Sequence, residues 1–74
     1  MDNMSERSFI FKKEFTTQDG TINEGRELRY VRGAWYLDGG MLPGSYYKLF
    51  KEMVTNEKLK NEYLTEVRVI RDKI

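Results

Sequence analysis

Hydrophobic and polar positions alternate near the start of the chain and change to a helical spacing after its middle. Phe9, Phe11 and Phe15 fall on one side of the segment 8–15, with mostly polar residues between them. A period of two residues is typical of a strand with one buried face. We therefore predict a strand over 8–15. Lys13 interrupts its apolar side, so the strand should bulge or leave the core there.

Short strands are also predicted over 21–22, 27–31 and 34–37, because each alternates and is bounded by turn residues. A tight turn at Arg32-Gly33 would place Tyr30 or Val31 beside Trp35, the only tryptophan. Positive φ angles are expected at one or more of the glycines that bound these strands: Gly25, Gly33, Gly39 and Gly40, with Gly39 or Gly40 as the first choice.

A helical spacing begins after Pro43, and a helical segment is predicted over about 45–62. Ser45 is the expected N-cap, and Thr55-Asn56 would end or bend the helix before a second short one. Residues 65–69 alternate again and predict a last strand. One face of the first helix carries the apolar residues Tyr46, Leu49, Phe50, Met53 and Val54.

This order of elements predicts one small α+β domain over 8–74, preceded by a flexible tail over 1–7. An SH3-like, mostly antiparallel, partly open barrel fits best, with a helix or helix pair inserted before the last strand. A flat meander covered by the helix is the alternative. The predicted core surrounds Trp35 and contains Phe9, Phe11, Leu28, Leu49, Phe50 and Val67.

Composition narrows the possible chemistry. The chain of 74 residues contains no cysteine and no histidine, so disulfides, thiolate metal sites and imidazole catalysis are excluded. Thirteen basic and twelve acidic side chains almost cancel, which argues against binding nucleic acid by bulk charge. No apolar run is long enough to span a bilayer, and the start of the chain is polar. A cytoplasmic location and no cofactor are expected.

Two segments resemble known small proteins. The stretch from Gly20 to Gly33 resembles the start of SH3-like and KOW-type modules. The segment Trp35 to Gly40, together with Tyr47 and Phe50, resembles small uncharacterised proteins of bacteriophages and prophages. These resemblances imply the barrel fold and an accessory role in a mobile genetic element, and they identify no binding residues.

The first candidate site is a strand surface with Arg26, Arg29 and Arg32, where Tyr30 and Tyr36 are interleaved. Basic groups contact phosphates and aromatic rings stack on bases, so this surface could bind nucleic acid. Arg26 and Arg29 have opposite strand parity, however, and need not share a face. Ordinary solvated charges are the simpler interpretation.

Two further candidates have simpler structural explanations. The amides at Gly44-Ser45 could hold an anion, as at any helix start. Asp19, Asp38 and Glu24 lie in predicted turns, where such side chains usually bond to nearby backbone rather than act as acids or bases.

Tyr47 is the last candidate, because adjacent residues on a helix point about 100° apart and Tyr46 already matches the apolar face. An exposed tyrosine is a plausible protein-contact anchor, although Tyr47 could also lie flat on the core edge. We therefore predict a non-enzymatic interaction module, a phage-encoded accessory protein that binds and modulates a host protein through Tyr36 and Tyr47. A small core and open strand edges favour a homodimer as well. Nucleic-acid binding is the alternative function.

Overall fold

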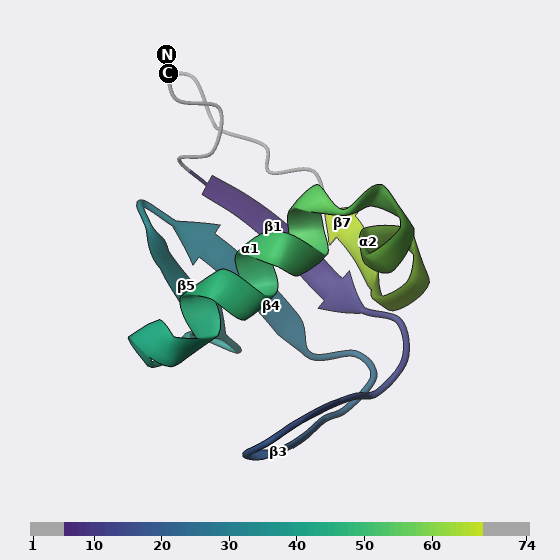
Figure 1. Cartoon of the computed structure of the whole chain (residues 1–74), viewed down its shortest axis with the longest axis horizontal. Helices are drawn as coiled ribbons and strands as arrows, with labels where there is room; N and C mark the ends of the chain where they lie inside the picture. Colours follow the sequence, from purple (N-terminus) through teal and green to yellow (C-terminus); the bar gives the residue numbers. More distant parts are fainter. Residues whose placement is uncertain (1–5, 68–74) are drawn as a thin grey trace.

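The computed structural model describes residues 6–67, and residues 1–5 and 68–74 lie outside the described part. Figure 1 shows a sheet with two helices on one face and a hairpin that extends from it. The elements follow the chain as β1 (Glu6–Phe11), β2 (Phe15–Thr17), β3 (Gly20–Ile22), β4 (Glu27–Val31), β5 (Ala34–Leu37), β6 (Gly40–Met41), the 3₁₀ turn η1 (Gly44–Tyr46), α1 (Tyr47–Thr55), α2 (Glu57–Tyr63) and β7 (Leu64–Val67).

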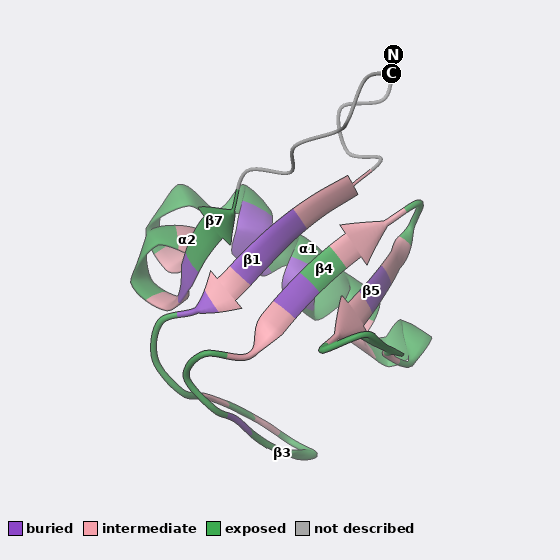
Figure 2. Ribbon diagram, turned by 180° about the vertical axis from the view of Figure 1, so that it is seen from behind, coloured by how far each residue is buried: buried purple, intermediate pink, exposed green. Residues whose placement is uncertain are grey.

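The main sheet has five strands in the order β6-β5-β4-β1-β7, and every neighbouring pair is antiparallel. Helices α1 and α2 lie on one face, and Figure 2 shows that no helix or strand within residues 6–67 covers the opposite, outer face. This arrangement confirms the predicted α+β class, with a helix pair before the last strand. The sheet does not close on itself, so any barrel is only partly formed.

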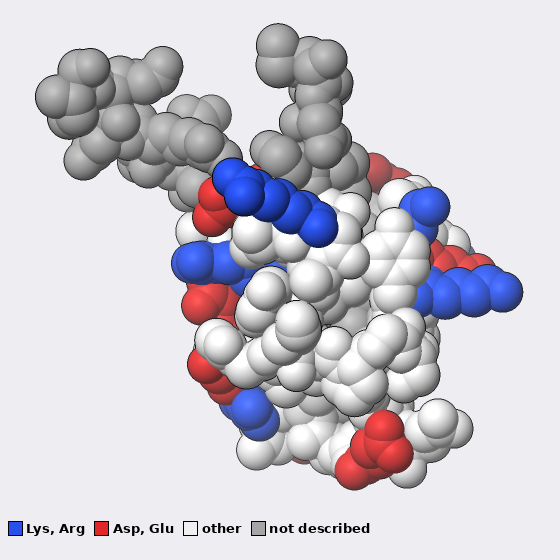
Figure 3. Space-filling model, turned by 90° about the vertical axis from the view of Figure 1, so that its left-hand side faces the viewer, with Lys and Arg blue, Asp and Glu red and all other residues white. Residues whose placement is uncertain are grey.

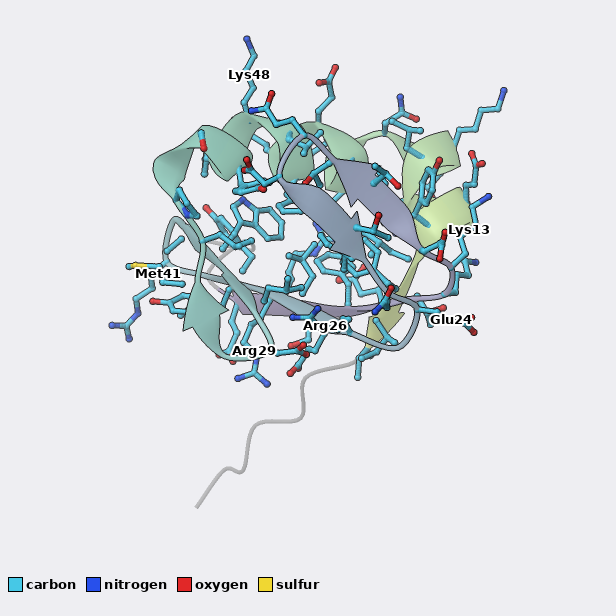
Figure 4. The ribbon with its side chains drawn as sticks, turned by 90° about the horizontal axis from the view of Figure 1, so that it is seen from below. Lys13, Glu24, Arg26, Arg29, Met41 and Lys48 are labelled. Carbon is cyan, nitrogen blue, oxygen red and sulfur yellow. The ribbon has the colours of Figure 1, made fainter. Side chains whose placement is uncertain are left out.

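Strands β2 and β3 form a separate two-stranded sheet that covers one side of the core. Ile22 on β3 is buried against that core. The Tyr46 hydroxyl donates to Asp19 Oδ2 at 2.6 Å and lies 3.3 Å from the Thr17 hydroxyl, which ties the hairpin to η1. Figure 4, seen from below, shows the hairpin nearest the viewer, across the end of the molecule where the main sheet and the helices face each other.

An aromatic cluster joins the sheet to helix α1. Trp35 on β5 is only 3% exposed, and its ring centroid lies 5.8 Å from Phe50 on α1 and 6.4 Å from Phe9 on β1. Tyr30 is its cross-strand partner, at 4.8 Å between centroids. The predicted burial and central place of Trp35 are therefore confirmed. The other buried core residues are Phe11, Ile22, Leu28, Met53, Val54 and Leu64.

The first strand differs from its prediction at both ends. Glu6 and Arg7, expected in the tail, belong to β1, where they pair with β4. The chain leaves the sheet after Phe11, and Phe15 instead begins β2. Phe15 still packs against Phe11, with 6.1 Å between the ring centroids, because the bend at Lys12-Lys13 folds β2 back over the core. The interruption at Lys13 thus marks a strand end.

Two predicted core residues are exposed. Leu49 is 37% exposed because it lies at the margin of the helix face that buries Phe50 and Met53. Val67 is 41% exposed because the register with β1 points Leu64 inward and Val67 toward the outer face. The predicted residues 68–69 of that strand lie outside the described part.

The helical segment breaks where expected but starts differently. Asn56 lies between the two helices, and its Oδ1 accepts from the amides of Lys58 and Leu59 at 3.1 and 3.2 Å. Ser45 is inside the 3₁₀ turn, and neither η1 nor α1 has a side-chain cap, so the N-cap prediction is wrong. No helix among residues 6–67 combines the length and apolarity needed to cross a membrane.

Both hairpin turns of the main sheet place two consecutive residues at positive φ. Arg32 and Gly33 have φ of 48° and 86°, and Asp38 and Gly39 have 50° and 89°. This pattern suits the right-handed twist of the strands they join. Gly39 confirms the glycine prediction, whereas Gly40 has no positive φ and opens β6.

Replacing Trp35 with alanine should unfold the domain. The lost contacts and the cavity would cost about 3–5 kcal/mol, which is as much as the single core of a domain this small supplies, roughly 3–5 kcal/mol. Thermal unfolding followed by circular dichroism measures the effect. A cooperative transition near the wild-type temperature would show that the core does not depend on Trp35.

Gly39→Ala and Gly40→Ala form a matched pair. Alanine at the left-handed Gly39 should lower the free energy of unfolding by about 1–2 kcal/mol. Alanine at Gly40 should change it by less than about 0.5 kcal/mol, because its added Cβ would meet only the Leu37 carbonyl, at an ordinary 3.5 Å. Denaturant titrations of both variants test this, and equal effects would contradict the turn geometry.

Candidate functional site

The two tyrosines predicted to contact a protein lie on different sides of the sheet margin. Tyr36 is on β5 and pairs with Met41 on β6, so both side chains belong to the outer face. Tyr47 is the first residue of α1, and it lines a hollow of about 210 Å³ together with Met41. The structure therefore does not bring Tyr36 and Tyr47 together directly, and Met41 lies between them.

Residues around Tyr47 form a surface without charged side chains. Gly44 lines the 210 Å³ hollow and the next residue, Ser45, lines a second hollow of about 330 Å³, and every residue that lines either one is uncharged. Figure 3, which views the side with β5 and the start of α1, shows a broad white area with charges only around it. We call this the uncharged surface. Its most exposed large apolar residues are Met41, Tyr47 and Leu49, at 64%, 37% and 37%.

Two lysines of α1 lie near Tyr47, and they differ in direction. Lys48 follows Tyr47 in α1 but projects away from the sheet in Figure 4, whereas Met41 projects from the sheet margin. Lys51 Nζ lies 5.8 Å from the centroid of the Tyr47 ring, so it borders this surface and holds the ring from one side. Because the rim of a protein interface is polar and solvent-accessible, a lysine at this border is compatible with an interface there.

The three candidate arginines do not form one basic surface. Arg26 Nε donates to Asp38 Oδ2 across the loop before β4. Arg29 Nη2 donates to Glu27 Oε2 at 3.1 Å and Arg29 Nε donates to Ser8 Oγ at 3.2 Å. Arg32 lies in the turn after β4. At about 3.3 Å per strand residue, Arg26 and Arg32 are separated by roughly 20 Å.

Arg29 and Tyr36 are nevertheless brought together on the outer face. Val67, Ser8, Arg29, Tyr36 and Met41 are successive cross-strand partners over all five strands of the main sheet. This row of cross-strand partners places Arg29 next to Tyr36, and its two ends are the apolar residues Val67 and Met41. In Figure 4, Arg29 points away from the helices.

The candidate carboxylates are bound to groups of the same domain. Asp19 accepts the Tyr46 hydroxyl. Asp38 accepts the amide of Glu27 at 3.0 Å and the guanidinium of Arg26. These two bonds, the amide first, hold the pKa of Asp38 below its ordinary value. Glu24 is exposed in a loop. Within residues 6–67 no three potential ligand side chains are grouped as a metal site requires.

Sequence reasoning missed the exposure of Met41 and Leu49, the two apolar residues that flank Tyr47 on the uncharged surface. One signal was present: residues 39–47 are nine consecutive uncharged positions in a chain that is 34% charged. The ion pair of Arg26 with Asp38 had no such signal, because it depends on how the loops fold together.

Comparison of the chain with protein-family models, with curated proteins and with solved structures yields no significant match.

Asp38 should make stability depend on pH. Its pKa is lowered in the folded state, so its contribution is full above the unfolded-state value of about 3.8 and is lost as the pH falls through the folded value. The stability difference between the wild type and Asp38→Asn should therefore shrink on acidification below about pH 4. Unfolding titrations from pH 7 to pH 2.5 measure this difference, and a constant difference would contradict the assigned hydrogen bonds.

Proposed function

We propose that this chain is a non-enzymatic protein-binding module that docks through the uncharged surface. The observation that supports this most is the continuous uncharged area around η1, which exposes Met41, Tyr47 and Leu49 in a chain with many charges. Such an area loses little hydration energy when a partner covers it, and buried interface cores are likewise poor in charged residues.

The geometry also suggests how a partner would be held. Tyr47 is partly exposed and lines the hollow of about 210 Å³, and Leu49 lines the one of about 330 Å³. Both hollows could receive apolar side chains of a partner. A tyrosine loses few rotamers on binding and often carries a large share of interface energy. Strand addition at the neighbouring edge is disfavoured, because β6 has two residues and Pro43, which follows soon after, lacks an N–H.

The resemblance to phage and prophage proteins gives this proposal a biological setting. In that setting the module is a phage-encoded accessory protein that binds and modulates a host protein in the host cytoplasm. A second copy of the chain is the other candidate protein partner, because β7 forms the remaining edge of the main sheet.

Tyr47→Ala should weaken partner binding by at least about 1 kcal/mol, or fivefold, without unfolding the domain. Lys48→Ala is the matched control, because Lys48 is adjacent in α1 but points away from the sheet. Arg29→Ala should weaken binding less than Tyr47→Ala. Proteins captured from a bacterial lysate by the wild type and each variant, with nuclease present, would be compared by quantitative mass spectrometry.

Nucleic-acid binding predicts a different result. Capture would be lost after nuclease treatment, and affinity would fall steeply between low and moderate salt because arginines release counterions from phosphates. If substitutions of Arg26, Arg29 and Arg32 abolish binding while Tyr47→Ala has no effect, protein binding through the uncharged surface is wrong.

A further inference from the structure

The outer face of the sheet contains a hollow that the proposed protein-binding surface does not use. It has a volume of about 350 Å³ and is lined by Glu27, Arg29, Val31, Tyr36, Asp38 and Gly39. This volume is at the lower end of those of small-ligand sites. The lining combines an aromatic ring, an apolar side chain, a guanidinium and two carboxylates in one place.

Arg29 is held in a fixed orientation within this hollow. Its Nε donates to the hydroxyl of Ser8, which is only 3% exposed, and its Nη2 donates to Glu27 Oε2. A guanidinium has five N–H groups, so these two bonds leave three donors for a ligand. The two bonds limit the orientations of a side chain that is otherwise 46% exposed, which lowers the conformational entropy that a bound ligand would cost it.

The hollow also provides acceptors, and both of its carboxylates are already paired with guanidinium groups. Glu27 is paired with Arg29, and Asp38 is paired with Arg26, which does not line the hollow. A ligand attracted mainly by charge, such as a free phosphate, would gain little from two internal ion pairs. A flat neutral ligand that has donors and acceptors on one edge would match the guanidinium and the carboxylate at the same time.

We propose that the outer-face hollow binds a nucleobase. The base stacks on Tyr36, Arg29 donates to an acceptor on its edge, and Glu27 accepts from its N–H groups. Guanine fits best, because its carbonyl oxygen can accept from the guanidinium while its two adjacent N–H donors face the carboxylate. Gly39 leaves the rim open, since a Cβ built there would have no atom within 4 Å.

This site differs from the basic strand surface expected from the sequence. Of the residues in that strand surface, the site uses Arg29 and Tyr36 only. It contacts the base, whereas the strand surface was expected to contact phosphates. A free nucleotide and a single-stranded nucleic acid both present such a base. The proposal does not depend on the protein-binding function, because Tyr47 and Met41 do not line this hollow.

The test is a titration of the whole chain with GMP, AMP, CMP and UMP, followed by NMR signals of the Tyr36 ring and the Arg29 Nε–H. Ribose 5-phosphate and inorganic phosphate control for the sugar and the phosphate. GMP should give saturable shifts at both residues, with a Kd below about 10 mM and at least about threefold tighter than UMP. Ribose 5-phosphate should give none.

Variants connect the shifts to the proposed contacts. Arg29→Gln should weaken GMP binding about tenfold, and Tyr36→Leu at least about fivefold. Glu27→Gln should remove the preference for GMP over UMP. Arg32→Gln and Tyr47→Ala are matched controls that should bind GMP as the wild type does, and amide spectra verify that every variant is folded.

Two outcomes identify the source of the base. If a guanine-containing RNA hexamer binds more than about tenfold tighter than GMP, the natural ligand is a single strand, and similar affinities indicate a free nucleotide. The proposal is overturned if no nucleotide saturates below about 10 mM, if ribose 5-phosphate produces the same shifts, or if Arg29→Gln binds GMP like the wild type.

Discussion

The packing of Trp35 against Phe50 is the contact on which the rest of the structure depends. It is the point where strand β5 meets helix α1, and Phe9 and Tyr30 complete the aromatic cluster around the indole. The indole Nε1 is buried, and residues 6–67 provide no hydrogen-bond partner for it. Its position therefore results from ring packing and burial, which must outweigh the cost of an unpaired N–H.

This core also explains why the uncharged surface exists. After β6 the chain must turn from the sheet to the helix that carries Phe50, and it does so through Pro43 and η1. Only Phe50, Met53 and Val54 of α1 reach the interior. Met41 precedes the turn and lies outside the core, so it remains exposed next to the helix start. The connection between the two layers and the start of α1 thus carry three of the four exposed large hydrophobic residues within residues 6–67.

The sequence predicted the strands better than the sites. The bounds of β4 and β5 agree with the predicted 27–31 and 34–37, because alternation and a two-residue turn are local signals. The prediction that Leu49 and Val67 are buried was wrong. Periodicity identifies which face of a helix or strand is apolar, but it does not show how much of that face the opposing layer covers. Strand parity suggested that Arg26 and Arg29 would lie on opposite faces. The ion pairs that they form, with Asp38 and Glu27, depend on strand register and loop contacts, which no short sequence pattern encodes.

Site-specific photocrosslinking in cells would test the central claim most directly. A photoreactive phenylalanine analogue would replace Met41, Tyr47 or Leu49 on the uncharged surface, and Lys48 or Lys58 as exposed controls. The account predicts discrete protein adducts, a second copy of the chain included, from the three surface positions and none from the two lysines. Adducts that form equally at all five positions, or that disappear on nuclease treatment, would contradict it.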